Sequence, residues 1–252
     1  MHSFLKLILL AVLVVSMSKC KSDDSSKTTL ASIPKSTEQK SEPEKSNSVL
    51  PAEEQVKTSD RNTSKTQTID AEDWTEITSA DGFVIDMKYA GNDNFTKRKI
   101  YDCGKCFLRP EAARRLKDIH AFLNQKYGYR IKVFDCFRPR PYQQRLWDIV
   151  PDPNYVTPPN KGSMHSRGLA VDLTITDSAG KELDMGTDFD FFGKEAHHDF
   201  KGHSPEINKN RALLKKVMES YGFKSIRTEW WHYSYAPVSY PLDEWVWPCE
   251  VQ

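Results

Sequence analysis

The sequence predicts an α+β fold with a largely antiparallel central sheet and flanking helices. Segments with strand and helix periodicity are mixed in the second part of the chain, without the regular strand-helix-strand alternation of a parallel sheet. All six tryptophans of the 252 residues lie in that part. Because its length is that of one folded unit, we predict a single domain at residues 72–252.

Each element follows from the spacing of its apolar residues. Apolar and polar residues that alternate indicate a strand, whereas apolar residues three or four positions apart indicate a helix. The clearest helix begins at Pro110, because proline is favoured in a first turn, and it stops at Gly128. The other patterns predict strands at 83–89, 129–136, 169–175 and 225–235, helices at 141–149 and 207–221, and a proline-rich loop beside the cleft at 151–159.

Residues 1–20 have the features of a secretion signal. Their apolar run at residues 7–15 is too short to span a bilayer but suits the core of a signal peptide. Cys20, at the end of the apolar segment, is similar to the lipid-accepting cysteine of a bacterial lipoprotein, although Lys19 stands where a small residue is usual. We therefore expect an exported protein of the periplasm or cell envelope. It contacts the membrane only through its signal or a lipid on Cys20, with plain cleavage after Ser18 as the alternative.

Residues 21–71 predict a disordered tether. They consist mainly of Ser, Thr, Lys, Glu and Gln with scattered prolines, and they contain hardly any aromatic or branched apolar side chain. Such a segment buries too little apolar surface to offset the conformational entropy that folding removes.

The charge and the cysteines narrow the function further. The net charge is +1 and no basic stripe interleaved with aromatic residues occurs, so nucleic acid is not an expected partner. A redox or zinc role for Cys103 and Cys106 is the weaker reading, because no second pair stands at zinc-ribbon spacing. The sequence carries no signal for an oligomeric state. In an exported domain we expect disulfides, with three pairings open, among Cys103, Cys106, Cys136 and Cys249.

Two segments far apart in the sequence hold the residue types of a catalytic zinc site. Such a zinc takes three nitrogen or oxygen ligands and keeps a fourth position for water, while a carboxylate that is not a ligand accepts the proton of that water. His165, Asp172 and His232 are candidates for the ligands, and Glu229 for the base. The helical H-E-x-x-H zinc motif does not occur in the sequence.

Local geometry bears on this grouping. Gly168 permits a turn between His165 and the strand that carries Asp172. Side chains alternate across a strand, so Asp172 leaves that strand on the face opposite its leucine and valine row. Glu229 and His232 are three positions apart and point to opposite faces of a regular strand. Either Glu229 precedes the strand, or a bulge turns it toward the site.

The two segments share their motifs with a known family. They read S-x-H-x-x-G-x-A-x-D at 163–172 and E-x-W-H at 229–232. Together with the string at 184–191, they resemble the zinc D-alanyl-D-alanine peptidases, and the VanX-type D-alanyl-D-alanine dipeptidases in particular. The resemblance spans roughly residues 75–245. It implies the hedgehog-like fold of that family, one Zn²⁺ per chain and a small dipeptide as substrate.

The resemblance also implies a function and roles for single residues. The function is zinc-dependent hydrolysis of D-alanyl-D-alanine to D-alanine in cell-wall peptide metabolism. Taken singly, Arg138 before Pro139 fits a solvated turn, Asp190 fits a turn cap, and Glu229 fits a salt-bridge partner. The implied roles are zinc ligands for His165, Asp172 and His232, general base for Glu229, oxyanion stabilisation for Arg138, and binding of the substrate ammonium for Asp190 and Ser163.

Other interpretations remain open. The same zinc chemistry serves D,D-carboxypeptidases and endopeptidases that act on peptidoglycan peptides. A non-catalytic, metal-dependent binding module is an alternative of another class, although binding alone needs neither Glu229 nor Arg138. A rival metal cluster is His197, His198 and His203, but no carboxylate base stands at a matching distance from it. Antibiotic resistance, cell-wall turnover and D-alanine scavenging are not distinguished, and selectivity for the D form rests on the resemblance alone.

Overall fold

The computed structural model describes residues 73–250. The predicted signal peptide, Cys20 and the tether predicted at 21–71 lie outside the described residues. Within the described range, no helix combines the length and the apolar character needed to cross a membrane.

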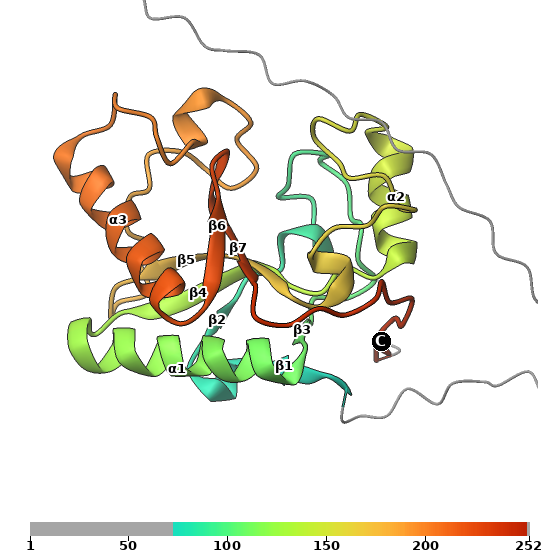
Figure 1. Cartoon of the computed structure of the whole chain (residues 1–252), viewed down its shortest axis with the longest axis horizontal. Coiled ribbons are helices and arrows are strands. Elements are labelled where there is room, and N and C mark those ends of the chain that lie inside the picture. Colours follow the sequence, from blue (N-terminus) through green and yellow to red (C-terminus); the bar gives the residue numbers. More distant parts are fainter. Residues whose placement is uncertain (1–72, 251–252) are drawn as a thin grey trace, which may run out of the picture. The chain divides into compact units, whose positions relative to one another are not determined.

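The centre of the domain is a five-stranded sheet (Figure 1). Its strand order is β2-β4-β5-β7-β6, and only the β2–β4 pair is parallel, which confirms the predicted α+β class with a largely antiparallel sheet. A small antiparallel sheet joins β1 and β3. The strands are β1 (Thr75–Ile77), β2 (Val84–Ile85), β3 (Cys106–Leu108), β4 (Arg130–Asp135), β5 (Ala170–Thr176), β6 (Phe223–Ile226) and β7 (Glu229–Tyr235).

Within residues 73–250, three α-helices accompany the sheet: α1 (Pro110–Tyr127), α2 (Arg140–Ile149) and α3 (Pro205–Ser220). Figure 1 shows α1 and α3 beside the strands, and α2 apart from these two helices. Helix α1 ends as predicted at Gly128, which has a φ of 68° and donates its N–H to the last turn of the helix. Helix α3 begins two residues before the predicted start, because the hydroxyl of Ser204 accepts the N–H of Ile207 and caps it.

Two strand predictions were wrong in extent. The strand predicted at 83–89 is only the two residues of β2, and the chain then turns into a short 3-10 segment at Lys88–Ala90. The single strand predicted at 225–235 is a hairpin of β6 and β7, in which Phe223 pairs with Tyr235. The turn between them, at residues 227–228, contains neither glycine, proline nor asparagine, so the sequence gives no turn signal there.

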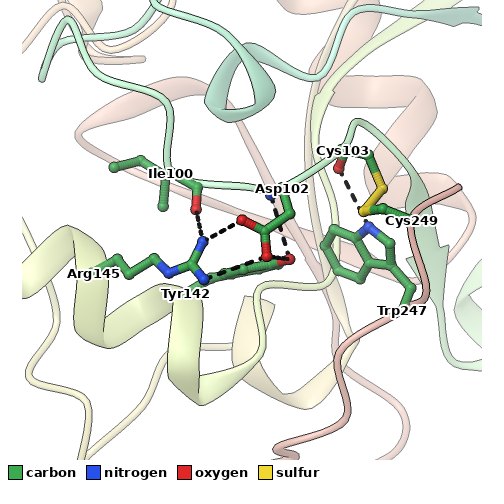
Figure 2. The surroundings of a disulfide bond; sticks show 7 residues. All are labelled: Ile100, Asp102, Cys103, Tyr142, Arg145, Trp247 and Cys249. Atoms are coloured by element: carbon green, nitrogen blue, oxygen red, sulfur yellow. Dashed lines mark hydrogen bonds and ion pairs between the residues drawn. A yellow bond between two sulfur atoms is a disulfide. The ribbon is translucent and has the colours of Figure 1, made fainter. Parts of the chain in front are cut away.

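Two disulfides show which of the three possible pairings the four cysteines adopt. Cys106–Cys136 joins β3 to the residue that follows β4. Cys103–Cys249 joins the loop before β3 to the C-terminal segment (Figure 2). Next to the second bond, the indole N–H of Trp247 donates to the carbonyl of Cys103 at 3.3 Å. The C-terminal segment is therefore fixed by a covalent bond as well as by the burial of Trp247.

Removal of the Cys103–Cys249 bond is expected to destabilise the domain more than removal of Cys106–Cys136. The bonds close loops with sequence separations of 146 and 30 residues. In the chain-entropy picture each bond contributes about 2–4 kcal/mol, and the longer loop adds roughly 1 kcal/mol more. Denaturant unfolding of the Cys103→Ala/Cys249→Ala and Cys106→Ala/Cys136→Ala variants measures both values. An unchanged free energy of unfolding in the first variant would contradict the expectation.

Candidate active site

Three buried side chains converge where β5 and β7 pair. Asp172 lies directly opposite His232 in the strand register, and His165 precedes β5 in a short 3-10 turn at His165–Arg167. The carboxylate oxygen Oδ1 of Asp172 lies 2.9 Å from Nδ1 of His232 and 3.3 Å from Nε2 of His165. Within residues 73–250, this is the group of His, Cys, Asp and Glu side chains whose geometry suits a shared metal ion.

The turn that positions His165 depends on Gly168. This residue has a φ of 70°, in the left-handed region that favours glycine, and its N–H donates to the carbonyl of His165. A Cβ at this position would collide with the ring of Trp74. The predicted glycine turn is thereby confirmed, and a second reason for the glycine is the close packing of Trp74.

The hydrogen bonds of the two histidines direct one nitrogen of each ring into the site. Nδ1 of His165 lies 2.7 Å from the carbonyl of Cys136, so it carries the proton and leaves Nε2 as an acceptor. Nε2 of His232 lies 3.0 Å from the hydroxyl of Ser234, and its Nδ1 faces His165 Nε2 at 3.1 Å. Two nitrogens and one carboxylate that converge in this way fit the donor set of zinc with an open fourth position.

The charges of the three side chains also suit a cation. Burial opposes ionisation of Asp172, but His165 and His232 outweigh burial and lower the pKa of this carboxyl far below its ordinary value. Burial likewise lowers the pKa of His165, yet Asp172 and Asp135 bring the net shift above the ordinary value. The carboxylate is therefore ionised, and its negative charge attracts positive charge to the position between the rings.

Glu229 lies next to this group without belonging to it. It is the first residue of β7 and pairs with Ile226, where the β6–β7 register shifts. Glu229 therefore lies at an irregular position within the strand, not in the loop before it, and it lines the same cavity as His232. Its Oε2 lies 4.0 Å from Nδ1 of His232. Burial raises the pKa of Glu229 above the ordinary value although His232 lowers it, so the side chain is suited to hold and release a proton.

Arg138 follows β4 and is held by a buried carboxylate. Its Nε and Nη2 donate to Oδ2 of Asp135 at 3.0 and 2.6 Å, and its Nη1 donates to Gln143 at 3.2 Å. The other oxygen of Asp135 accepts the hydroxyl of Tyr101 at 2.5 Å. The turn interpretation of Arg138 is therefore wrong, because the guanidinium is buried and fixed. Sequence reasoning missed Asp135 and Gln143; the D-x-x-R spacing at the end of β4 is the one signal that points to Asp135.

Asp190 and Ser163 face the same cavity from two loops. Asp190 has a φ of 59°, and its carboxylate accepts the hydroxyl of Tyr89 at 3.0 Å. Burial, with the nearby charge of Asp172, raises the pKa of Asp190 well above the ordinary value. The hydroxyl of Ser163 is buried and has no hydrogen-bond partner in the described part of the chain. Both groups are therefore free to bind a polar ligand.

A single cavity of about 370 Å³ brings the predicted residues together. Residues of the predicted proline-rich loop, Tyr155 and Thr157, form part of its wall. Its lining includes every site residue that the sequence predicts, namely Arg138, Ser163, His165, Asp172, Asp190, Glu229 and His232.

The rival histidines do not form a site. His203 Nε2 lies 2.7 Å from the carbonyl of Glu195, and His197 Nδ1 lies 3.0 Å from the guanidinium of Arg227. Burial lowers the pKa of His198 to about 4. Among the described residues, none of the three belongs to a metal-binding group.

Comparisons with known proteins identify the family of the chain. The model of the M15 peptidase family, described as D-ala-D-ala dipeptidase, matches residues 68–244. The chain is 40% identical over 160 residues to a D-alanyl-D-alanine dipeptidase of Escherichia coli, covering 63% of this chain and 82% of that protein. It is 35% identical to one of Enterococcus faecalis, covering 62% and 87%, and 33% identical to one of Enterococcus faecium, also covering 62% and 87%.

The purified protein is expected to contain about one zinc per chain, and His232→Ala is expected to lose it. Removal of one of three ligands leaves two, which is too few for a stable zinc site. His203→Ala is the matched control, because His203 is bonded to a backbone carbonyl away from the group. Metal analysis of the three proteins measures the content. Zinc retained at the native level in His232→Ala would show that His232 is not a ligand.

Proposed function

Because the chain belongs to the M15 family of D-Ala-D-Ala dipeptidases, we propose that it is a zinc metallopeptidase that hydrolyses the dipeptide D-alanyl-D-alanine to D-alanine. The observation that carries the proposal is the gathering of all seven predicted site residues around one small cavity. A volume of about 370 Å³ lies near the lower end for small-molecule sites and suits a dipeptide.

The proposed zinc ligands are His165, Asp172 and His232, which have the required atoms within 4.8 Å of one another. When bound, zinc supplies a Lewis acid that makes a water molecule more acidic and polarises the peptide carbonyl. The hydrogen bond of His165 to Cys136 keeps the ring in the orientation needed for this task.

Glu229 moves the protons of the reaction. It accepts a proton from the attacking water and returns it to the amine of the leaving D-alanine. The raised pKa supports both steps, because a carboxylate with a very low pKa accepts a proton poorly. Its Oε2 lies 4.0 Å from Nδ1 of His232, a proposed zinc ligand, so the carboxylate is next to the position where the reaction takes place.

Arg138 stabilises the negative charge that develops on the carbonyl oxygen. A well-placed donor of this kind contributes on the order of 3 kcal/mol to the transition state. Asp135 and Gln143 fix the guanidinium in advance, so the arginine loses little side-chain entropy when the reaction proceeds.

Asp190 and Ser163 bind the free ammonium of the dipeptide. The carboxylate of Asp190 forms no ion pair within residues 73–250, and the hydroxyl of Ser163 is without a partner in the same range. Both are thus available to the substrate. An ammonium bound by these groups sets the length of the substrate, because a longer peptide carries a neutral amide at that position.

Two alternatives remain for the test. A D,D-carboxypeptidase or endopeptidase uses the same catalytic groups but tolerates an acylated amine. A metal-dependent binding module needs neither the base nor the fixed arginine, and the presence of Glu229 and Arg138 in the cavity favours catalysis.

The finer description of the fold and the location are part of the proposal. We assign the domain, predicted at residues 72–252, to the hedgehog-like peptidase fold on the strength of the motifs and the family match. Export through residues 1–20, with a lipid on Cys20 and a tether at 21–71, is supported by the two disulfides, which persist in oxidising compartments. A protein at this location has access to cell-wall peptides.

Glu229→Ala is expected to lower kcat about 10²- to 10⁴-fold while the zinc content stays near that of the native protein, because the base is not a ligand. Glu206→Ala, an exposed glutamate of α3, is the control and should change neither value. Steady-state kinetics with the free dipeptide and metal analysis check both points. A Glu229→Ala protein with native kcat would show that the base is misassigned.

The free dipeptide is expected to be cleaved faster than N-acetyl-D-alanyl-D-alanine. Acetylation removes the positive charge and leaves the side chain of Asp190 without its charged partner, a loss of about 1–3 kcal/mol or one to two decades in kcat/KM. Asp190→Asn should reduce the difference in kcat/KM between the free and the acetylated dipeptide. Equal rates on the two substrates, or a preference for a cell-wall pentapeptide, would replace the dipeptidase with the carboxypeptidase.

A further inference from the structure

Three buried polar atoms without partners lie on the face of the sheet away from the active site. Tyr233 follows the proposed zinc ligand His232 in β7, so its side chain points to the other face, on which α3 packs. The hydroxyl of Tyr233, Nη2 of Arg211 in α3 and Nε2 of His198 are buried, and each lacks a hydrogen-bond partner within residues 73–250. Because buried polar groups in native proteins are almost always bonded, these atoms indicate a ligand.

The three side chains are close to one another. The ring centroids of His198 and Tyr233 lie 6.3 Å apart. Nη1 of Arg211 donates to the carbonyl of His197, the residue before His198, at 3.1 Å, and Nε donates to the carbonyl of Met185 at 2.6 Å. Two nitrogens thus fix the guanidinium, and Nη2 is the nitrogen that remains for a ligand.

The charge of Arg211 is not balanced by a nearby carboxylate. Its hydrogen bonds within the described chain go to backbone carbonyls. Burial lowers the pKa of Arg211 to about 10, although Tyr233 and Asp184 act in the opposite direction. Asp184 is exposed, and its carboxylate accepts the N–H of Gly186. A buried guanidinium without a counter-charge is costly, so this region favours an anion.

The surroundings of His198 are positive as well. Burial lowers the pKa of His198 to about 4, the charges of Lys215 and Arg211 add to this effect, and Asp199 opposes it. Asp199 is exposed and lies 3.7 Å from the guanidinium of Arg227, so its charge is partly balanced. His198 is therefore neutral near pH 7, and a neutral imidazole can present an N–H donor at Nε2.

We propose that Arg211, Tyr233 and His198 form a binding site for one small monovalent anion of the chloride type between α3 and β7. All three groups donate to the ion. One guanidinium balances one negative charge, and a buried position disfavours a divalent or bulky anion, because its desolvation costs more. The bound ion links α3 to β7 and stabilises the native state. None of the three residues lines the active-site cavity, so the site is independent of the proposed function.

Thermal unfolding of the zinc-loaded protein, in mixtures of chloride and gluconate at constant ionic strength, tests the site. Gluconate is too bulky for a buried position of this kind. A ligand that binds the native state alone stabilises it by RT ln(1 + [L]/Kd), so Tm is expected to rise by roughly 3–6 °C for each tenfold increase in chloride above Kd. Equal Tm values in all mixtures would show that water occupies the position, and the proposal would be overturned.

Three variants locate the effect. Arg211→Met removes the charge and is expected to abolish the dependence of Tm on chloride. Tyr233→Phe removes a hydroxyl and keeps both hydrogen bonds of Arg211, so it should weaken chloride binding about tenfold and keeps the test available if Arg211→Met does not fold. Arg114→Met, at an exposed arginine of α1, is the control and should retain the native dependence. Zinc content is measured for each protein, because Tyr233 is adjacent to His232.

Bromide separates this position from the zinc, to which a halide can also bind. Anomalous diffraction from crystals of the native protein grown in bromide is expected to show a peak at hydrogen-bond distance from Nη2 of Arg211 and the hydroxyl of Tyr233. Bromide at the zinc alone would overturn the proposal. A chloride effect that persists unchanged in Arg211→Met and Tyr233→Phe would do the same, because it would belong to another position.

Discussion

The fully buried carboxylate of Asp135 is the constraint on which the site depends. A buried charge without partners costs several kcal/mol, and here each oxygen has partners: Oδ2 accepts two donors of Arg138, and Oδ1 accepts Tyr101 and the backbone N–H of Cys136. The segment of residues 135–138 also supplies the backbone carbonyl of Cys136, which orients the ring of His165. One short segment at the end of β4 thus fixes both the arginine and a proposed metal ligand, and the Cys106–Cys136 bond anchors it to β3.

The parts of the site that follow from local rules are those that the sequence predicts. The glycine turn after His165, the alternation of β5 and the start and stop of α1 depend on neighbouring residues, and the structure has all three. The alternation did not predict that both faces of β5 are covered, because burial of its second face requires the loops of the active site. The disulfide pairing depends on residues that are 146 and 30 positions apart, so no local spacing rule predicts it.

The strands also show why a proposed metal would contribute to folding. Two ligands, Asp172 and His232, come from paired strands, and the third comes from the turn that enters β5. Two ring nitrogens, Nε2 of His165 and Nδ1 of His232, lie 3.1 Å apart beside a carboxylate, an arrangement that one shared proton or cation satisfies. Binding of the proposed metal would therefore stabilise the native state relative to the unfolded chain, in which these residues are far apart.

The two ends of the described chain meet in one aromatic stack. Trp74 lies 4.0 Å from the ring of Phe137, and Trp74 and Trp245 stack on each other at 5.3 Å. Phe137 is the neighbour of Arg138, and Trp74 also fills the space beside Gly168. A mechanical pull on the N-terminal end of the domain would load Trp74 before it reached the five-stranded sheet. A pull on the C-terminal end would be borne first by the Cys103–Cys249 bond, which lies outside Trp245 in the chain. Tension along the chain is therefore resisted by the stack at one end and by a covalent bond at the other.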